Sequence, residues 1–312
     1  MIIPQGVWPT MVTPFKADQQ IDYAGLEQLI EWYLAHGVQG LFSVCLSSEM
    51  YQLSLAERVK VARFVTDQVA GRVPVVASGH ISYSVEDQID EIKQISAAGV
   101  TAFVLNTNRL ARASEDDEVL KQRAAFILEQ VPDVAFGLYE CPVPYKRSLS
   151  PELLGWLART GRFYFLKDTE GVPAHMKAKL EAVQGTPLRI FDAESATLLT
   201  SLEAGASGYS GIMANFHPDL YVELIKSYTV HPERAHRLQN YIGLASAMGR
   251  VLYPVGSKYY LQLEGLELLL DGRTQHKEAF TVYMQHEIEH LRRSDQDIRS
   301  QIAANSSDKL HI

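Results

Sequence analysis

Eight strand-then-helix units in succession predict that this chain folds into a (β/α)8 barrel, the TIM-barrel architecture. The units occupy roughly 225 residues, which is near the usual size of such a barrel. Most of their strands are short apolar runs, which is typical of parallel strands buried on both faces. After residue 228 only helical patterns continue. We therefore expect a barrel domain at residues 1–228 and a C-terminal helical extension at residues 229–312.

The expected strands are bounded by glycine, proline and polar residues. The first contains two prolines and should be a short strand that runs into a turn. In chain order they cover residues 6–15, 40–45, 73–78, 102–106, 134–140, 163–167, 188–191 and 207–212. An open doubly wound sheet is the alternative, but its first turn is normally rich in glycine, and the turn after Phe15 is not.

Helix starts are marked by Asp22, Ser54 and Ser84, whose side chains can cap the free N–H groups of a first turn. Gly37 ends the first helix. The helices of the barrel are expected at residues 23–36, 55–70, 84–98, 114–130, 150–159, 173–183, 195–203 and 218–227. In the extension, three helices are expected at residues 231–249, 257–270 and 277–302, followed by a frayed end at residues 303–312.

The composition is that of an acidic globular protein. The 312 residues are 46% hydrophobic and 21% charged, and the formal net charge is -8. An acidic chain binds nucleic acid poorly, so we expect no nucleic-acid partner. The first residues lack the features of a signal peptide, and no apolar run is long enough to span a membrane. These observations predict a cytoplasmic protein with no membrane partner.

The two cysteines, Cys45 and Cys141, are too few for a disulfide framework and lack metal-ligand spacing. Both fall near strand ends. A redox pair is possible there, but two incidental buried thiols are favoured.

A lysine ends the most apolar of the expected strands. Residues 163–166 are bulky and apolar, and Lys167 and Asp168 follow them. Loss of water at the end of a buried strand lowers the pKa of a lysine, and a neutral amine can form a Schiff base with a carbonyl. The alternative is that Lys167 only marks the exposed end of the strand.

Polar side chains gather at five of the expected strand ends, where the active sites of such barrels lie. They include a nucleophile candidate in Lys167, a proton-transfer candidate in Tyr139, and a hydroxyl-rich loop suited to an anion. The full set is Ser47, Ser48, Glu49, Asn106, Thr107, Asn108, Arg109, Tyr139, Glu140, Cys141, Lys167, Asp168, Asp192 and Glu194.

Four stretches together resemble the dihydrodipicolinate synthase / N-acetylneuraminate lyase family of class I aldolases and lyases. They are Val12-Thr13-Pro14-Phe15, Ser47-Ser48-Glu49, Tyr139-Glu140-Cys141-Pro142 and Leu166-Lys167-Asp168. They stand in the order that the family has, each at an expected strand end. The similarity extends from residue 6 to residue 218.

The resemblance implies that Lys167 forms a Schiff base with the keto carbon of pyruvate or a related 2-oxo acid. The protonated imine withdraws electrons, so a C–C bond beyond it can break or form. Tyr139 would transfer protons near that bond, while Ser47 and the N–H of Ser48 would hold the substrate carboxylate. Tyr209 is counted with them as a substrate-binding residue. The resemblance implies no metal and no other cofactor, and a homo-oligomer, either tetramer or dimer.

The sequence also departs from the family pattern. Leu46 stands where the family has the first of two hydroxyl residues, and Ser48 stands where it has glycine. Residues 105–109 lack the tyrosine that a neighbouring subunit contributes in dihydrodipicolinate synthases, and Glu140 replaces a frequent asparagine. These departures predict that the Schiff-base chemistry is kept and that condensation with aspartate semialdehyde is not.

The resemblance leaves the basic residue of the site undecided. Dihydrodipicolinate synthases carry an arginine shortly after the tyrosine motif. Here the candidates are Lys146 and Arg147, displaced slightly by Pro144.

Four other functions remain open. With the same lysine the chain could be a 2-keto-3-deoxy sugar acid dehydratase, a true dihydrodipicolinate synthase or a non-catalytic 2-oxo-acid binder. The fourth is a zinc hydrolase, because His286-Glu287-Ile288-Glu289-His290 matches the H-E-x-x-H pattern. That stretch lies in the extension, where a solvated helix face is the favoured interpretation.

Overall fold

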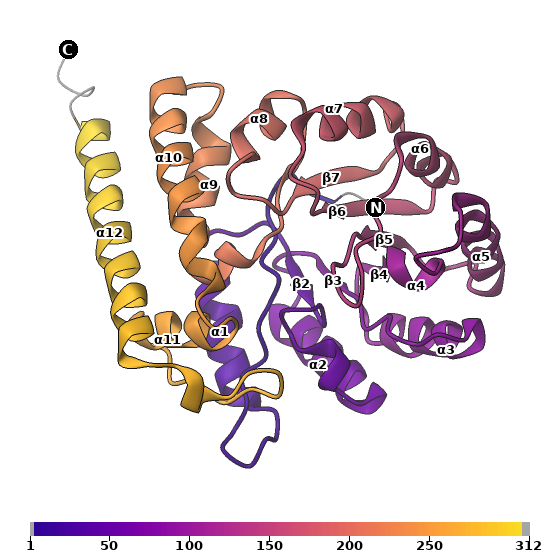
Figure 1. The fold of residues 1–312 in the computed structure, drawn as a ribbon, viewed down its shortest axis with the longest axis horizontal. Coiled ribbons are helices and arrows are strands. Elements are labelled where there is room, and N and C mark those ends of the chain that lie inside the picture. The colour runs from indigo at the N-terminus through magenta and orange to yellow at the C-terminus, as the bar shows by residue number, and fades with distance from the viewer. Residues whose placement is uncertain (1–2, 308–312) are drawn as a thin grey trace.

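The computed structural model describes residues 3–307, and its eight parallel strands form a barrel with helices around it (Figure 1). The order of the strands in the sheet is β1-β8-β7-β6-β5-β4-β3-β2. The strands are β1 Gly6–Val7, β2 Leu41–Ser43, β3 Val75–Ala77, β4 Ala102–Asn106, β5 Phe136–Tyr139, β6 Phe163–Asp168, β7 Arg189–Asp192 and β8 Gly208–Tyr209. The predicted (β/α)8 fold with a C-terminal helical extension is confirmed.

Backbone hydrogen bonds between β2 and the segment after β1 close the sheet. The Phe42 N–H donates to the Pro9 carbonyl at 3.0 Å, and the Met11 N–H donates to the Phe42 carbonyl at 3.0 Å. Proline has no N–H to give to a ladder, so the segment after Val7 cannot continue as a regular strand. The first strand therefore has only two residues, where the sequence predicted residues 6–15.

The barrel helices lie close to their predicted positions. They are α1 Tyr23–Ala35, α2 Leu55–Val69, α3 Val85–Ser96, α5 Asp117–Gln130, α6 Pro151–Arg159, α7 Pro173–Ala182, α8 Leu198–Glu203 and α9 Pro218–Ser227. Ser54 and Ser84 accept hydrogen bonds from the backbone three residues later, as predicted for caps. Asp22 stands at the cap position of α1 but makes no side-chain cap bond.

Short helical turns also occur where loops were expected. α4 Thr107–Leu110 follows β4 directly, and two 3-10 turns, η1 Met50–Gln52 and η2 Ile212–Asn215, follow β2 and β8. These turns redirect the chain at the carboxyl ends of the strands.

The extension consists of α10 Pro232–Ala245, η3 Ser246–Arg250, α11 Val255–Leu263, η4 Lys277–Ala279 and α12 Val282–Ser307. The second helix stops earlier than the predicted residue 270, because Gly265 takes a left-handed conformation at φ +95°. The last helix continues through Ser307 instead of fraying at Ala303, and residues 308–312 lie outside the described part. The division at residue 228 stays a prediction.

Aromatic side chains fill the interior of the barrel. Phe165 is fully buried, and its ring lies 4.8 Å from that of Phe191, 5.4 Å from Trp8 and 5.8 Å from Phe42 between centroids. Side chains along a strand alternate between its two faces. Lys167, two residues after Phe165, therefore points to the same interior, one layer nearer the carboxyl ends.

Within residues 3–307, no helix combines the length and the apolar character that crossing a membrane requires.

Candidate active site

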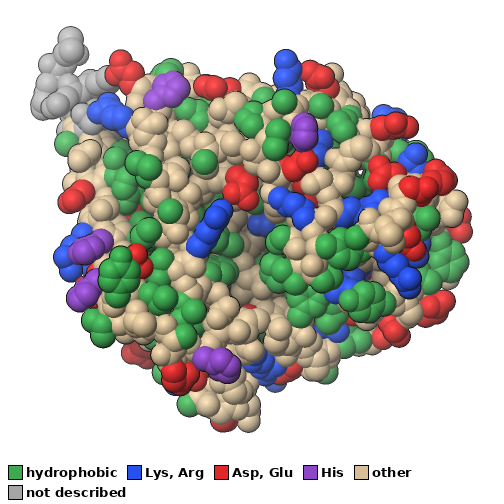
Figure 2. Space-filling view, viewed as in Figure 1, with side chains coloured by type: hydrophobic (Ala, Val, Ile, Leu, Met, Phe, Trp, Pro, Cys, Tyr) green, Lys and Arg blue, Asp and Glu red, His purple; other side chains and the backbone are tan. Residues whose placement is uncertain are grey.

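A cavity of about 510 Å³ opens at the carboxyl ends of the barrel strands. Figure 2 shows a hollow in this face of the molecule, with basic side chains beside it. Lys167, Tyr139, Ser47 and Tyr209 all line the cavity. The structure thus brings together four of the five predicted site residues.

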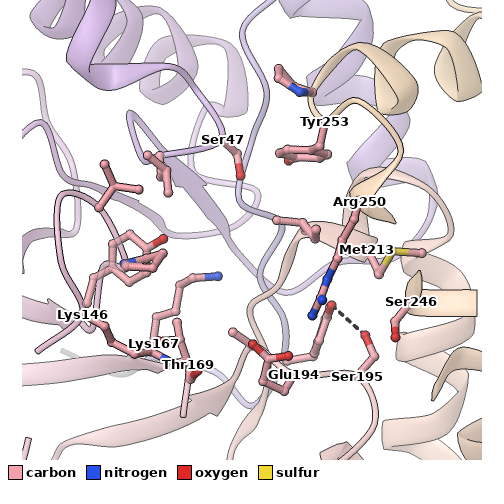
Figure 3. A pocket seen from close by; sticks show the side chains of 18 of the residues that line it. Ser47, Lys146, Lys167, Thr169, Glu194, Ser195, Met213, Ser246, Arg250 and Tyr253 are labelled. Atoms are coloured by element: carbon pink, nitrogen blue, oxygen red, sulfur yellow. Dashed lines mark hydrogen bonds between the residues drawn. The ribbon is translucent and has the colours of Figure 1, made fainter. Parts of the chain in front are cut away.

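Lys167 points into this cavity from the end of β6 (Figure 3). Its side chain is 3% exposed, and its Nζ donates a hydrogen bond to the Ser210 carbonyl. Burial lowers the pKa of Lys167 to about 8, because the charged ammonium loses its water. The alternative that Lys167 marks an exposed strand end is therefore wrong.

A second buried lysine shows that a lowered pKa alone does not identify a nucleophile. Burial lowers the pKa of Lys258 on α11 to about 8 as well. Its Nζ donates to the Asp271 carbonyl at 2.5 Å and lies 3.7 Å from the Glu49 carboxylate. Lys258 does not line the cavity. Lys167 alone of these two combines a lowered pKa with open space in front of the amine.

Tyr139 is the direct partner of Lys167 across β5 and β6. Paired residues of parallel strands share a face, and the Lys167 Nζ lies 5.3 Å from the centre of the Tyr139 ring. The phenol is buried, and this burial raises its pKa well above the usual value. Tyr139 therefore keeps its proton near neutral pH, and its role in proton transfer stays a prediction.

Ser47 and Ser48 have different surroundings. Ser47 lines the cavity, and its hydroxyl donates to Thr10 Oγ1 at 3.2 Å. The Ser48 hydroxyl donates to the Met11 carbonyl at 2.6 Å, and its N–H donates to the Cys45 carbonyl at 3.1 Å. Ser48 thus holds the turn after β2 and does not line the cavity, so its predicted contact with a substrate carboxylate stays a prediction.

Tyr209 contributes the wall of the cavity at the end of β8. Its ring stacks on that of Tyr221 at 3.9 Å between centroids, and its hydroxyl lies 3.1 Å from the Ser195 hydroxyl. Burial raises its pKa as well. The stacked and bonded ring makes this part of the wall rigid.

Of the two basic candidates after β5, only Lys146 lines the cavity, and its Nζ donates to the Thr169 carbonyl. Arg147 turns away and pairs with Asp117 at 2.9 Å.

The structure also shows the surroundings of the residues that depart from the family pattern. Leu46 lines the cavity with an apolar side chain. Asn108 follows β4 near the position of the missing tyrosine, and its amide donates to the carbonyls of Cys141, Val143 and Tyr145. This residue therefore fixes the loop after β5. Both Cys45 and Cys141 are free and buried, as the favoured prediction had them.

Glu140 belongs to a buried ionic cluster on the outer side of the same two strands. The Lys179 Nζ of α7 lies 2.6 Å from the carboxylates of Glu140 and Asp168 and 3.1 Å from that of Glu170. Burial, together with Asp168, raises the pKa of Glu140 to about 7. Burial lowers the pKa of Lys179, but the carboxylates raise it by more, so the ammonium stays charged.

Among the described residues, the carboxylates of Glu140, Asp168 and Glu170 form the one group of possible ligands that could share a metal ion. Its oxygen atoms lie within 4.8 Å of one another. The Lys179 ammonium contacts all three carboxylates and supplies the positive charge that a cation would bring, so the residues present do not fit a metal.

The two histidines of the H-E-x-x-H pattern do not belong to that group. The His286 side chain is 61% exposed on α12, and its Nδ1 lies 3.2 Å from the Glu289 carboxylate. His290 lines a shallow groove with residues of α10. These positions agree with a solvated helix face.

Sequence reasoning missed the contribution of the extension to the cavity. Arg250 and Tyr253 come from the segment between α10 and α11, and Thr274 and Gln275 come from the segment before η4. Figure 3 shows the Tyr253 ring beside Ser47, and the Asn215 amide donates to the Tyr253 hydroxyl at 3.0 Å. The only sequence signal was that residues 250–256 and 271–276 fall between predicted helices.

Comparison with known proteins gives one consistent result. The model of the Dihydrodipicolinate synthetase family matches residues 3–270. A 4-hydroxy-tetrahydrodipicolinate synthase of Anaplasma marginale (strain Florida) is 26% identical over 264 residues, which cover 83% of this chain and 85% of that protein. The putative 2-dehydro-3-deoxy-D-gluconate aldolase YagE of Escherichia coli K12 is 30% identical over 232 residues, covering 72% and 74%.

Solved structures show the same fold. Dihydrodipicolinate synthase DapA-2 of Bacillus anthracis superposes with a TM-score of 0.84 at 22% identity, covering 94% of this chain and 99% of that one. The E. coli K12 YagE structure in complex with pyruvate gives a TM-score of 0.82 at 23% identity, covering 95% and 98%.

The ionic cluster gives a stability prediction. Lys179→Met leaves three carboxylates without their cation, and breaking a buried pair in this way costs about 3–5 kcal/mol. We expect that loss in the free energy of unfolding measured with urea. Lys177→Met, an exposed lysine of the same helix, is the control and should change stability by less than about 0.5 kcal/mol. Equal effects of the two substitutions would show that the cluster is not held by Lys179.

Proposed function

Because this chain belongs to the dihydrodipicolinate synthetase family, whose members are class I lyases and aldolases, we propose that it acts on pyruvate or a related 2-oxo acid through a Schiff base at Lys167. The observation that carries the proposal is the buried Lys167 amine, with its lowered pKa, facing a cavity beside Tyr139. The net reaction is C–C cleavage or condensation.

The first step uses the neutral amine. The Nζ lone pair attacks the keto carbon of the 2-oxo acid, and the keto oxygen takes up protons and leaves as water, which gives a protonated imine. The iminium then accepts the electron pair of a C3–H or C3–C4 bond and becomes an enamine. Tyr139 transfers the proton that this step releases or consumes.

The polar groups near Lys167 suit the rest of a 2-oxo acid. Ser47 offers a hydroxyl at the cavity wall on the side of β2, where we place the C1 carboxylate. Lys146 and the protonated imine add positive charge that favours an anionic substrate. Tyr209 limits the cavity on the side of β8.

The apolar Leu46 and the absence of a tyrosine after β4 favour a partner substrate other than aspartate semialdehyde. The 30% identity to YagE supports cleavage of a longer 2-oxo acid as the main candidate. Dehydration of a 2-keto-3-deoxy sugar acid would use the same lysine. The ratio of pyruvate plus aldehyde to dehydrated product, measured by mass spectrometry, separates the two reactions.

A cytoplasmic location and assembly into a homo-oligomer, tetramer or dimer, are part of the same proposal. The acidic balance of the chain agrees with the location, which cell fractionation checks. Light scattering of the purified protein should give a multiple of 34.9 kDa, and a single chain mass would contradict the assembly.

Borohydride reduction in the presence of pyruvate should attach one pyruvate-derived group to the wild-type chain. Peptide mapping should place it on Lys167 and not on Lys258, since only Lys167 faces the cavity. The trapping rate at low pyruvate should rise about tenfold from pH 7 to pH 9, because the neutral amine increases through a pKa of about 8. Lys167→Ala should abolish the adduct, and Lys177→Met should keep it. Binding of pyruvate without any adduct would favour the non-catalytic binder.

Tyr139→Phe tests proton transfer apart from imine formation. The variant should still form the borohydride adduct but exchange the pyruvate methyl protons with D2O about 100- to 10,000-fold more slowly, the usual contribution of a general acid–base group. Proton NMR follows this exchange directly. Tyr283→Phe, at an exposed position of α12, is the matched control. Unchanged exchange in Tyr139→Phe would assign proton transfer elsewhere, and Tyr253→Phe would then be the comparison.

A further inference from the structure

The cavity is larger than pyruvate requires. Pyruvate has six non-hydrogen atoms, which would occupy roughly 180 Å³ even at the roughly 30 Å³ that each molecule has in liquid water. The cavity holds about 510 Å³. A longer 2-oxo acid fits, and its far end must meet residues beyond Lys167 and Tyr139.

The cavity is positively charged although the chain is acidic. Three basic side chains line it, Lys146, Lys167 and Arg250, against one acidic side chain, Glu194. Lys167 is used for the imine, and the Lys146 Nζ is bonded to the Thr169 carbonyl. For Arg250 no hydrogen bond or ion pair is found within the described residues. Figure 3 shows the Arg250 side chain reaching from η3 into the cavity, toward Glu194 and Ser195.

The backbone that carries Arg250 is tightly seated. A Cβ at Gly249 would lie 2.3 Å from the Met213 sulfur, and a Cβ at Gly256 would lie 2.2 Å from the Val251 carbonyl oxygen. Leu252 has a left-handed φ of +40°, which a branched side chain rarely adopts and which costs about 1–3 kcal/mol. Close packing on both sides of Arg250 holds the chain in this conformation and fixes the point from which the guanidinium extends.

The extension supplies a further part of the same wall, beyond the residues that the family model matches. Thr274 and Gln275 line the cavity, and the matched region ends at residue 270. The buried Glu49 carboxylate accepts hydrogen bonds from the N–H groups of Arg273 and Thr274, both at 2.6 Å, and from the Thr274 hydroxyl at 2.8 Å. Arg273 also pairs with Glu57 at 2.7 Å. This anchoring fixes the segment that carries Thr274 and Gln275 at the outer part of the cavity.

We infer that Arg250 binds a carboxylate at the far end of the substrate, so that the preferred 2-oxo acid is a dicarboxylic acid longer than pyruvate. A guanidinium matches a carboxylate with two parallel N–H···O bonds, which gives direction as well as charge. Ser47 and Lys167 hold the 2-oxo acid end, and Arg250 selects the opposite end. The inference rests on the proposed Schiff base at Lys167.

The experiment compares borohydride trapping of 2-oxoadipate and 2-oxohexanoate, which have the same chain length and differ in the terminal carboxylate. Wild type should trap 2-oxoadipate about 10- to 100-fold more efficiently, the usual value of a hydrogen bond to a charged group. Arg250→Gln should reduce this ratio to about one. Arg250→Lys should keep part of the ratio, since lysine has the charge but lacks the two parallel N–H donors of a guanidinium. Arg293→Gln, an exposed arginine on α12, should leave the ratio as in wild type.

Three results would overturn the inference. They are equal trapping of the two acids by wild type, an Arg250→Gln variant that keeps the full ratio, and a clear preference for 2-keto-3-deoxygluconate over 2-oxoadipate. Borohydride trapping of pyruvate by wild type distinguishes failure of the Arg250 inference from failure of the proposed function. An adduct with pyruvate but no discrimination would remove only the Arg250 subsite, while no adduct with any 2-oxo acid would remove the Schiff base itself.

Discussion

Burial of the Lys167 amine above the aromatic layer of the barrel is the constraint on which the site depends. Phe165 and Phe191 fill the space below it and keep water out, so the ammonium form is disfavoured. The parallel register then sets Tyr139 directly beside it. The proposed nucleophile and the proposed proton donor are thus placed side by side by strand pairing, so no loop has to order before they meet.

The same two strands carry opposite chemistry on their outer faces. Glu140 follows Tyr139, and Asp168 follows Lys167, so alternation turns both carboxylates toward α7, where Lys179 neutralises them. One lysine is thereby made easier to deprotonate and the other is locked in its charged form, although both are buried. The carboxylates that surround Lys179 raise its pKa, whereas the hydrogen bond of Lys167 goes to a neutral backbone carbonyl and burial lowers its pKa.

Much of this arrangement could be predicted from the sequence because the strands and their end residues follow from patterns of neighbouring residues. Apolar runs located the strands, and Lys167 and Tyr139 stood at their ends. The shortened first strand could have been anticipated from its prolines. Arg250, Tyr253 and Thr274 could not be found, because they come from irregular segments whose contacts are with residues far away in the sequence, such as Glu49 and Asn215. Neither periodicity nor spacing encodes such contacts. The sequence does not distinguish Ser48 from Ser47. The structure does, because the Ser48 side chain is bonded within the turn after β2, while Ser47 lines the cavity.

The hydrogen bonds from Thr274 and Arg273 to Glu49 join the end of β2 to a segment that is synthesised near the end of the chain. Because a chain is made from its N-terminus, Lys167 is synthesised before Arg250, Tyr253 and Thr274, which complete the cavity wall. Until these residues pack against the barrel, the part of the cavity wall that they supply is missing. The outer wall is thus the last part of the cavity to be completed, and it comes from a different part of the chain than Lys167.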